Sequence, residues 1–258
     1  MAEVTIIGCG NLGSALITGL SKSGNHTITA YDIDPDALEG VAPLCETTTS
    51  DLDEATASEV VIVAVKPKHI EAVLDDLDLS PEQTLVTVAA GVPKAFVEAR
   101  TEATVVRIMP NLAAETRDMA TAVTWDEVDE TVAELLDDLG EFAEIDEAQM
   151  DVATALNGSG PAFVFYFLQA MKEAGVEEGL TEEEAETLAA QTFKGAAETV
   201  HHSEKSVDEL IDAVCSPNGT TIEGMEVLWD SDVEPVIGEA LAAATERSRE
   251  LADDFDDE

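Results

Sequence analysis

A glycine-spaced turn near the amino terminus limits the folds open to this chain more than any other segment. Residues 4–13 read VTIIGCGNLG, an apolar run followed by G-x-G-x-x-G and then by a helical pattern. This context is typical of the turn between the first strand and the first helix of a dinucleotide-binding domain. Gly8 permits the tight turn, Gly10 lets the backbone approach a pyrophosphate, and Gly13 lets the helix pack closely on the strand. A plain tight turn is the alternative; we predict a dinucleotide site.

Short β-branched runs alternate with helical patterns through the first 150 residues. Strands are predicted over residues 4–7, 27–31, 60–65, 84–88 and 104–109, with 119–125 and 142–145 as candidate edge strands. Their near-continuous apolar character is typical of a parallel sheet that is covered on both faces. The alternation of strand and helix therefore predicts a doubly wound α/β sheet.

The strand signal stops after about residue 150, and the remaining residues read as helices. Two capping boxes, Thr181 with Glu184 and Ser206 with Glu209, each open a helix, and residues 236–251 form the last one. The segment 163–171 is apolar nearly all round, which is typical of a buried helix. We therefore predict that it packs against another subunit. The fold class is an α/β chain with a Rossmann NAD(P)-binding domain over 1–150 and an all-helical dimerisation and substrate-binding domain over 151–258.

The chain is strongly acidic, with 56 Asp and Glu against 12 Lys and Arg and a formal charge of −44. It therefore lacks the basic surface that nucleic acids or anionic lipids attract. Its apolar share of 45% predicts a packed core rather than disorder. Because acids are scattered everywhere, we interpret them as halophilic adaptation to a salt-rich cytoplasm, where the Debye length falls to about 3 Å at 1 M. An acidic partner-binding face is the alternative, but only residues 253–258 are clustered, and these we expect to form a frayed, solvated tail.

Several other classes of protein are not indicated. The three cysteines form no CxxC pair, and the four histidines fall in no metal-ligand spacing, so we expect neither a disulfide framework nor a metal site. No signal peptide is visible, and no apolar stretch approaches the roughly 18 residues that a membrane span needs. We expect a cytoplasmic protein that binds neither membrane nor nucleic acid.

Residues at the ends of the predicted strands complete the cofactor site. Asp32 ends the second predicted strand, 19 residues after Gly13, where an acid typically bonds the adenosine ribose and repels a 2′-phosphate. This favours NADH over NADPH, although acids are abundant in this chain. Small residues at 89–91 indicate a close approach of ligand or backbone, and the amide of Asn111 is placed to bond the nicotinamide side. The predicted cofactor residues are Gly8, Gly10, Asn11, Leu12, Gly13, Asp32, Ala64, Val65, Lys66, Pro67, Ala90, Gly91 and Asn111.

A second candidate site lies where residues 213–221, AVCSPNGTT, join two predicted helices. Helical spacing resumes after it, which places Gly219, Thr220 and Thr221 at a helix N-terminus. Free backbone N–H groups and hydroxyls converge there, as a carboxylate or phosphate requires. Helix capping by Thr221 alone is the alternative.

Six segments together resemble the pyrroline-5-carboxylate reductase family over nearly the whole chain. They are GCGNLG at 8–13, AVKP at 64–67, AAGV at 89–92, MPN at 109–111, GSGPAF at 158–163 and DAVCSPNGTT at 212–221. The resemblance implies NAD(P)H-dependent reduction of 1-pyrroline-5-carboxylate to L-proline, the last step of proline biosynthesis. It also implies a homodimer with interleaved helical domains, and further assembly of dimers into a decamer.

The resemblance also assigns roles at the second site. It implies that the loop of Ser216, Asn218, Gly219, Thr220 and Thr221 binds the substrate carboxylate through backbone amides. It implies that the Thr221 hydroxyl bonds the ring nitrogen, which makes Thr221 the catalytic candidate.

Three residues depart from the family pattern: Asn218 stands where a second glycine is usual, Asn157 where serine is common, and Asp32 in a family that often uses NADPH. A related imine reductase or a β-hydroxyacid dehydrogenase-like oxidoreductase is the alternative enzyme. The hydroxyacid enzymes use a lysine early in the first helix of the second domain, whereas the first lysine here is Lys172, near the predicted helix end.

Overall fold

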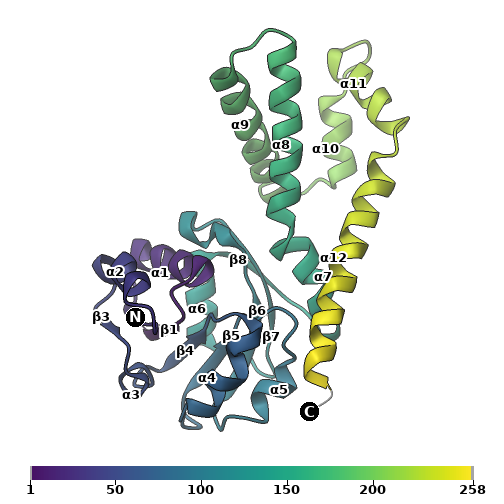
Figure 1. Cartoon of the computed structure of the whole chain (residues 1–258). Helices are drawn as coiled ribbons and strands as arrows, with labels where there is room; N and C mark the ends of the chain where they lie inside the picture. The colour runs from purple at the N-terminus through teal and green to yellow at the C-terminus, as the bar shows by residue number, and fades with distance from the viewer. Residues whose placement is uncertain (1, 257–258) are drawn as a thin grey trace. The chain divides into compact units, whose positions relative to one another are not determined.

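The computed structural model describes residues 2–256 and divides into two compact units (Figure 1). The first unit contains the residues up to 159 together with those from 241 onward, and the second contains residues 160–240. The first unit is built around a sheet, whereas the second is entirely helical. The predicted fold class, an α/β Rossmann unit followed by helices, is confirmed.

The sheet has eight strands in the order β3-β2-β1-β4-β5-β6-β7-β8. Neighbouring strands are parallel except for β6 and β7, which pair antiparallel. The strands are β1 (Glu3–Ile7), β2 (Thr27–Tyr31), β3 (Thr47–Thr49), β4 (Val60–Val63), β5 (Thr84–Thr87), β6 (Thr104–Met109), β7 (Met119–Thr124) and β8 (Gly140–Glu144). All seven predicted strands are present, and β3 was not predicted because its three threonines lie in a polar run with no apolar signal.

Helices cover the sheet in the first unit. The α-helices are α1 (Asn11–Ser23), α2 (Pro35–Val41), α3 (Leu52–Ala55), α4 (Ile70–Asp76), α5 (Lys94–Glu98), α6 (Glu130–Leu139) and α7 (Met150–Ala153). Short 3₁₀ turns are η1 (Ala42–Leu44), η2 (Pro67–His69), η3 (Leu112–Thr116) and η4 (Glu147–Gln149), and η5 (Thr154–Gly158) is a π turn.

Apolar side chains fill both faces of the sheet. Ile6 and Ile7 are consecutive in β1 and fully buried, yet they belong to different core clusters. This follows from the two-residue period of a strand, which turns successive side chains to opposite faces. Ile6 packs in the cluster that contains Leu16 of α1, and Ile7 packs in the cluster that contains Leu74 of α4. A sheet covered on both faces leaves its strand ends as the place where ligands bind.

The second unit contains α8 (Gly160–Glu177), α9 (Glu182–His201), α10 (Val207–Val214), α11 (Thr220–Trp229) and the first part of α12 (Val233–Asp256). Both predicted capping boxes are formed at the starts of α9 and α10. Phe165 and Tyr166 of the apolar helix α8 are 67% and 75% exposed, so a single chain does not bury them. Among residues 2–256, no helix combines the length and the apolar character needed to cross a membrane.

The prediction of a frayed acidic tail is wrong for the residues that the structure describes. Helix α12 continues to Asp256, and Phe255 meets the ring of Phe96 edge-on at 4.9 Å between centroids. The apolar Phe255 interrupts the acidic run and packs the end of α12 within the first unit. Residues 257 and 258 lie outside the described residues.

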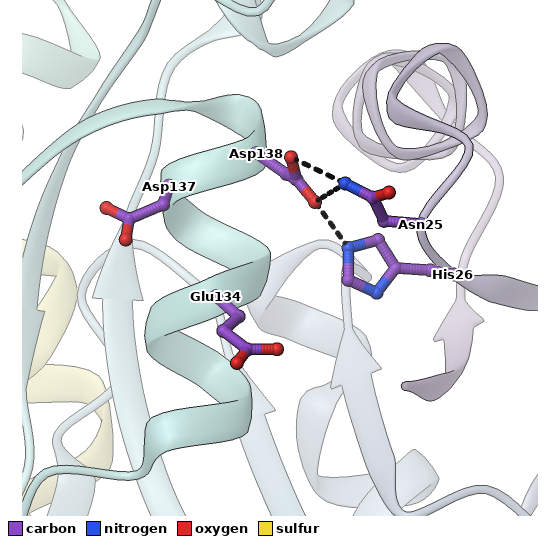
Figure 2. Close-up of a pocket in the computed structure, with 5 residues that line it drawn as sticks. All are labelled: Asn25, His26, Glu134, Asp137 and Asp138. Carbon is purple, nitrogen blue, oxygen red and sulfur yellow. Dashed lines mark hydrogen bonds and ion pairs between the residues drawn. The ribbon is translucent and has the colours of Figure 1, made fainter. Parts of the chain in front are cut away.

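A polar cluster joins the end of α1, the start of β2 and the end of α6 (Figure 2). Asp138, near the end of α6, accepts hydrogen bonds from Asn25 Nδ2 at 2.9 Å and His26 Nε2 at 2.8 Å. Arg117 adds an ion pair at 3.3 Å, and Glu134 and Asp137 line the same hollow of about 350 Å³. Asn25 and His26 lie between the end of α1 and the start of β2, so the cluster ties both elements to α6.

Asp138 makes the stability of the first unit sensitive to acid. Burial raises the pKa of Asp138, but hydrogen bonds from Asn25 and His26 and the charges of His26 and Arg117 outweigh it and hold that pKa below its ordinary value. A lowered folded-state pKa stabilises the fold fully above the unfolded-state pKa of about 4 and loses this effect as the pH falls through the folded-state pKa.

We therefore expect Asp138→Ala to lower the free energy of unfolding by about 2 kcal/mol at pH 7. The difference from wild type should shrink below about pH 4, as measured by urea unfolding from pH 7 to pH 3. Asp137→Ala, which removes the neighbouring acid of the same hollow, is the control and should change the free energy of unfolding by less than about 0.5 kcal/mol. A difference for Asp138→Ala that does not depend on pH would contradict the prediction.

Candidate functional site

The three glycines of the amino-terminal turn occupy three different environments. Gly8 has φ +100°, and a Cβ there would lie 2.8 Å from the carbonyl oxygen of Ala64. A Cβ on Gly13 would lie 1.8 Å from the carbonyl oxygen of Gly8, so α1 packs directly on the turn. A Cβ on Gly10 would meet nothing within 4 Å. Two glycines are therefore required by packing, whereas Gly10 leaves open space beside the backbone.

Helix α1 presents an uncapped N-terminus to that open space. Gly10 is its N-cap residue, no side chain caps it, and its first turn contains no acidic residue. This is unusual in a chain with 56 acids among 258 residues. Free N–H groups, the positive end of the helix dipole and a first turn without acidic residues together suit an anion. The residues present thus fit the pyrophosphate of a dinucleotide.

Asp32 is fixed beside the glycine turn. One carboxylate oxygen accepts the N–H of Cys9 at 2.7 Å, and the other accepts the N–H of Asp34 at 2.9 Å. Burial, and to a smaller extent the charges of Asp32 and Cys45, raise the pKa of the Cys9 thiol to about 12. Cys9 is therefore a neutral packing residue, and no thiolate chemistry is available in the turn.

The other predicted cofactor residues lie at the carboxyl ends of the strands, but with different surroundings. Ala64 and Val65 contact the Gly8 turn, whereas Lys66 is exposed and precedes η2. Gly91 has φ +75°, and a Cβ there would lie 2.7 Å from Leu251 of α12. The small residues at 89–91 were expected to allow the close approach of either a ligand or the backbone. At Gly91 it is the protein itself that occupies the space.

Asn111 caps η3, since its Oδ1 accepts the N–H of Ala113 at 3.0 Å. Near it, Asn11, Ser14 and Leu112 line a hollow of about 450 Å³ between α1 and η3. The sequence interpretation missed Ser14, whose hydroxyl donates to the carbonyl oxygen of Gly10 at 2.6 Å, and the 57% exposed Leu112. In the sequence, only the short separation of Ser14 from Gly10 and of Leu112 from Asn111 could have indicated that these two residues line the site.

The second candidate site has the predicted backbone geometry. Asn218 has φ 57°, so it adopts the left-handed conformation expected where the family pattern has glycine. The N–H of Gly219 donates to the carbonyl oxygen of Ser216 at 2.9 Å, which closes the turn before α11. Gly219 is the N-cap residue of α11 and no side chain caps this helix, so Thr221 does not serve as a cap. The N–H groups of its first turn and the Thr221 hydroxyl remain available to a ligand.

The comparison with protein-family models matches both parts of the chain. The model described as pyrroline-5-carboxylate reductase dimerisation matches residues 147–251, and the one described as NADP oxidoreductase coenzyme F420-dependent matches residues 3–91. Within residues 2–256, no group of three or more His, Cys, Asp or Glu is arranged to hold a metal ion.

Known proteins resemble the chain over almost its full length. Pyrroline-5-carboxylate reductase from Methanosarcina acetivorans is 36% identical over 96% of this chain and 97% of that protein, and the one from Pseudomonas aeruginosa is 38% identical over 97% of each. The solved structure from Coxiella burnetii is 32% identical, with a TM-score of 0.88 over 97% of this chain and 98% of that one. That from Plasmodium falciparum, which has NADP bound, is 26% identical, with a TM-score of 0.84 over the same shares.

The glycine geometry predicts opposite effects for two similar substitutions. We expect Gly10→Ala to shift the unfolding midpoint by no more than about 2 °C, because the added methyl enters open space. It should weaken NADH binding at least about tenfold, because the methyl enters the space of the pyrophosphate. Thermal unfolding and a fluorescence titration with NADH measure the two effects.

Gly13→Ala is the matched variant and should destabilise the fold by more than about 4 kcal/mol, since its methyl would overlap a backbone oxygen. Wild-type NADH affinity in Gly10→Ala would show that no pyrophosphate lies beside this turn.

Proposed function

The chain belongs to the pyrroline-5-carboxylate reductase family, and on that premise we propose how its two sites divide the reaction. It is an NAD(P)-dependent oxidoreductase that reduces 1-pyrroline-5-carboxylate to L-proline. In the proposal, residues 1–150 bind the cofactor and residues 151–258 bind the substrate and form the dimer. The observation that supports this most is the uncapped N-terminus of α11, whose first turn has free backbone N–H groups and contains Thr221.

The substrate is a small cyclic imine that carries one carboxylate. We assign the carboxylate to the N–H groups around Gly219 and Thr220, because a helix N-terminus binds an anion without a cationic side chain. Thr221 is half-buried and one residue further into the helix, and its hydroxyl is assigned to the ring nitrogen. Ser216 and Asn218 shape the turn that presents these groups.

The reaction requires the protein mainly to bind and align the cofactor and the substrate. Gly10, Asn11 and Leu12 would hold the cofactor phosphates at the start of α1, and the bound cofactor supplies the hydride. The protein must bring the imine carbon within about 3–3.5 Å of the hydride donor, in line with the transfer. A protonated cyclic imine is already electrophilic, so no strong general acid is required, and Thr221 orients the nitrogen or delivers its proton.

The coenzyme of this chain is proposed to be NADH. The NADP seen in the Plasmodium falciparum relative belongs to that protein. Here Asp32 fixes a carboxylate beside the glycine turn, where a 2′-phosphate would meet it. All five arginines form ion pairs with acids outside residues 32–36. None of them is therefore placed to bind a 2′-phosphate beside Asp32. Those acids are Glu71 for Arg100, Glu147 for Arg107, Asp138 for Arg117, Glu250 for Arg247 and Glu246 for Arg249.

Two further proposals concern assembly and environment. The exposed apolar side chains of α8 favour a homodimer in which the partner covers them, and further assembly to a decamer follows the family pattern. The charge of −44 favours work in a salt-rich cytoplasm, where screening lowers its self-repulsion.

The environment of Lys172 argues against the alternative of a hydroxyacid dehydrogenase. Its ammonium lies 2.6 Å from Glu186 of α9, and this hydrogen bond raises the pKa of Lys172 above its ordinary value. A lysine held in its charged form by a carboxylate is poorly suited to act as a base.

The assay of the proposed reaction uses purified protein, 1-pyrroline-5-carboxylate and NADH or NADPH in molar KCl. We expect cofactor oxidation and proline formation by the wild type. Thr221→Ala should lower kcat/KM at least about tenfold, because a hydrogen bond to the reacting imine is lost. The affinity for NADH should stay within about twofold.

Thr192→Ala is the control, because among residues 2–256 that hydroxyl bonds only Leu188 within α9. Folded wild-type protein without turnover would refute the assignment, and unchanged kcat/KM in Thr221→Ala would remove Thr221 from the site.

The coenzyme proposal predicts that Asp32→Ser raises the NADPH/NADH ratio of kcat/KM at least about tenfold, since a carboxylate that repels the 2′-phosphate is removed. The same assay with both coenzymes measures the ratio. Asp36→Ser removes one charge from the same segment without touching the glycine turn and should leave the ratio within about twofold. Equal ratios in wild type and Asp32→Ser would disprove the role of Asp32.

A further inference from the structure

Asn157 occupies a junction between the sheet and the first helix of the second unit. It lies in the π turn η5, which is closed by the N–H of Ser159 donating to the carbonyl oxygen of Thr154 at 2.9 Å. A π turn contains one residue more than an α-helical turn, and such turns frequently occur at functional sites. Gly158 follows Asn157, and a Cβ there would lie 3.5 Å from the Met109 sulfur, so the turn also packs on β6.

The Asn157 amide binds two strands at once. Its Nδ2 donates to the carbonyl oxygen of Met109 at 2.6 Å and to that of Ala120 at 3.0 Å. These carbonyls belong to β6 and β7, whose antiparallel pairing runs from Arg107 opposite Thr124 to Met109 opposite Ala122. The side chain therefore supplies donors at the point where the ladder between these strands ends.

The orientation of this amide is fixed by chemistry. Two carbonyl oxygens can only accept, so the NH₂ group must face them, and both of its hydrogens are used. The Oδ1 atom is left buried without a partner in the part of the chain that the structure describes. An unpaired buried acceptor is costly. This cost is offset by the two hydrogen bonds that the NH₂ group of the same side chain donates to the carbonyl oxygens.

The position of these carbonyls connects Asn157 to the cofactor. Met109 is the last residue of β6, and Pro110 and Asn111 follow it directly. Asn111 caps η3 through its Oδ1, so its NH₂ group is the donor left for the nicotinamide side. Holding the Met109 carbonyl fixes the direction in which the chain leaves the strand toward Asn111.

We infer that Asn157 is a positioning residue for the reduced cofactor, which acts through Met109 on the segment that ends at Asn111. The inference rests on the proposed function, since it assigns Asn111 to the nicotinamide side. Serine, common at this position in the family pattern, has one O–H donor and can serve only one of the two carbonyls. Aspartate is nearly isosteric but would direct an acceptor-only carboxylate at both.

The test is a fluorescence titration of NADH into wild type, Asn157→Ala, Asn157→Ser and Asn157→Asp without substrate. We expect Kd to rise about tenfold in Asn157→Ala, at least as much in Asn157→Asp, and less in Asn157→Ser. In the full assay, KM for NADH should rise while KM for pyrroline-5-carboxylate stays within about twofold. Should Asn157→Ala not fold, Asn157→Ser still tests the inference through the same Kd.

Asn25→Ala is the matched control. It removes an amide that donates two hydrogen bonds to Asp138 and that follows the carboxyl end of α1, the end opposite Gly10. It should lower the unfolding midpoint and leave the Kd for NADH within about twofold. An unchanged Kd in folded Asn157→Ala and Asn157→Ser, with only a lower midpoint, would overturn the inference. Wild-type protein that binds NADH but does not turn over would instead refute the proposed function, because the titration contains no substrate.

Discussion

The close packing of α1 against the end of β1 is the contact on which the proposed cofactor site depends. With no Cβ on Gly13, the helix approaches the carbonyl oxygen of Gly8 more closely than any other residue would allow. This approach directs the free N–H groups of α1 at the carboxyl edge of the sheet. The bond from the Cys9 N–H to Asp32 then ties β2 to the same turn. One contact between backbone segments thus fixes both the proposed anion site and the carboxylate beside it.

The two proposed sites solve the same electrostatic problem in the same way. Both expected ligands are anions, and the chain carries a charge of −44. Its few cations are largely committed elsewhere: buried Lys94 binds Glu98 and Asp126, and buried Arg107 binds Glu147. Burial lowers the pKa of Lys94, but its hydrogen bonds with Asp126 and Glu98 outweigh this and raise it, so the buried charge is retained. In the proposed sites, the uncapped helix N-termini at Gly10 and Gly219 take the place of basic side chains.

Much of the fold follows from local patterns, and the differences have local causes. Strong apolar runs predicted seven strands. Strand β3 was not predicted, because Thr47–Thr49 is an edge strand that pairs with β2 and contains no apolar residue that would indicate a strand. The acidic tail was misjudged because one aromatic residue, Phe255, determines its packing on Phe96. At the site, the sequence indicated crowding around Gly91 but not that Leu251, 160 positions later, would cause it. Contacts between distant segments of the chain carry no signal in a short window.

The use of backbone amides also suits concentrated salt. At about 1 M salt the Debye length is about 3 Å, so charges on surface side chains neither repel nor attract a ligand over distance. A ligand is then selected only by groups that touch it, at hydrogen-bond distances of about 2.7–3.2 Å. In the proposal Asp32 is such a group, since the N–H groups of Cys9 and Asp34 hold its carboxylate at the glycine turn. If the protein works in such salt, as proposed, the coenzyme choice would rest on one fixed carboxylate, which is why a single substitution there is expected to change it.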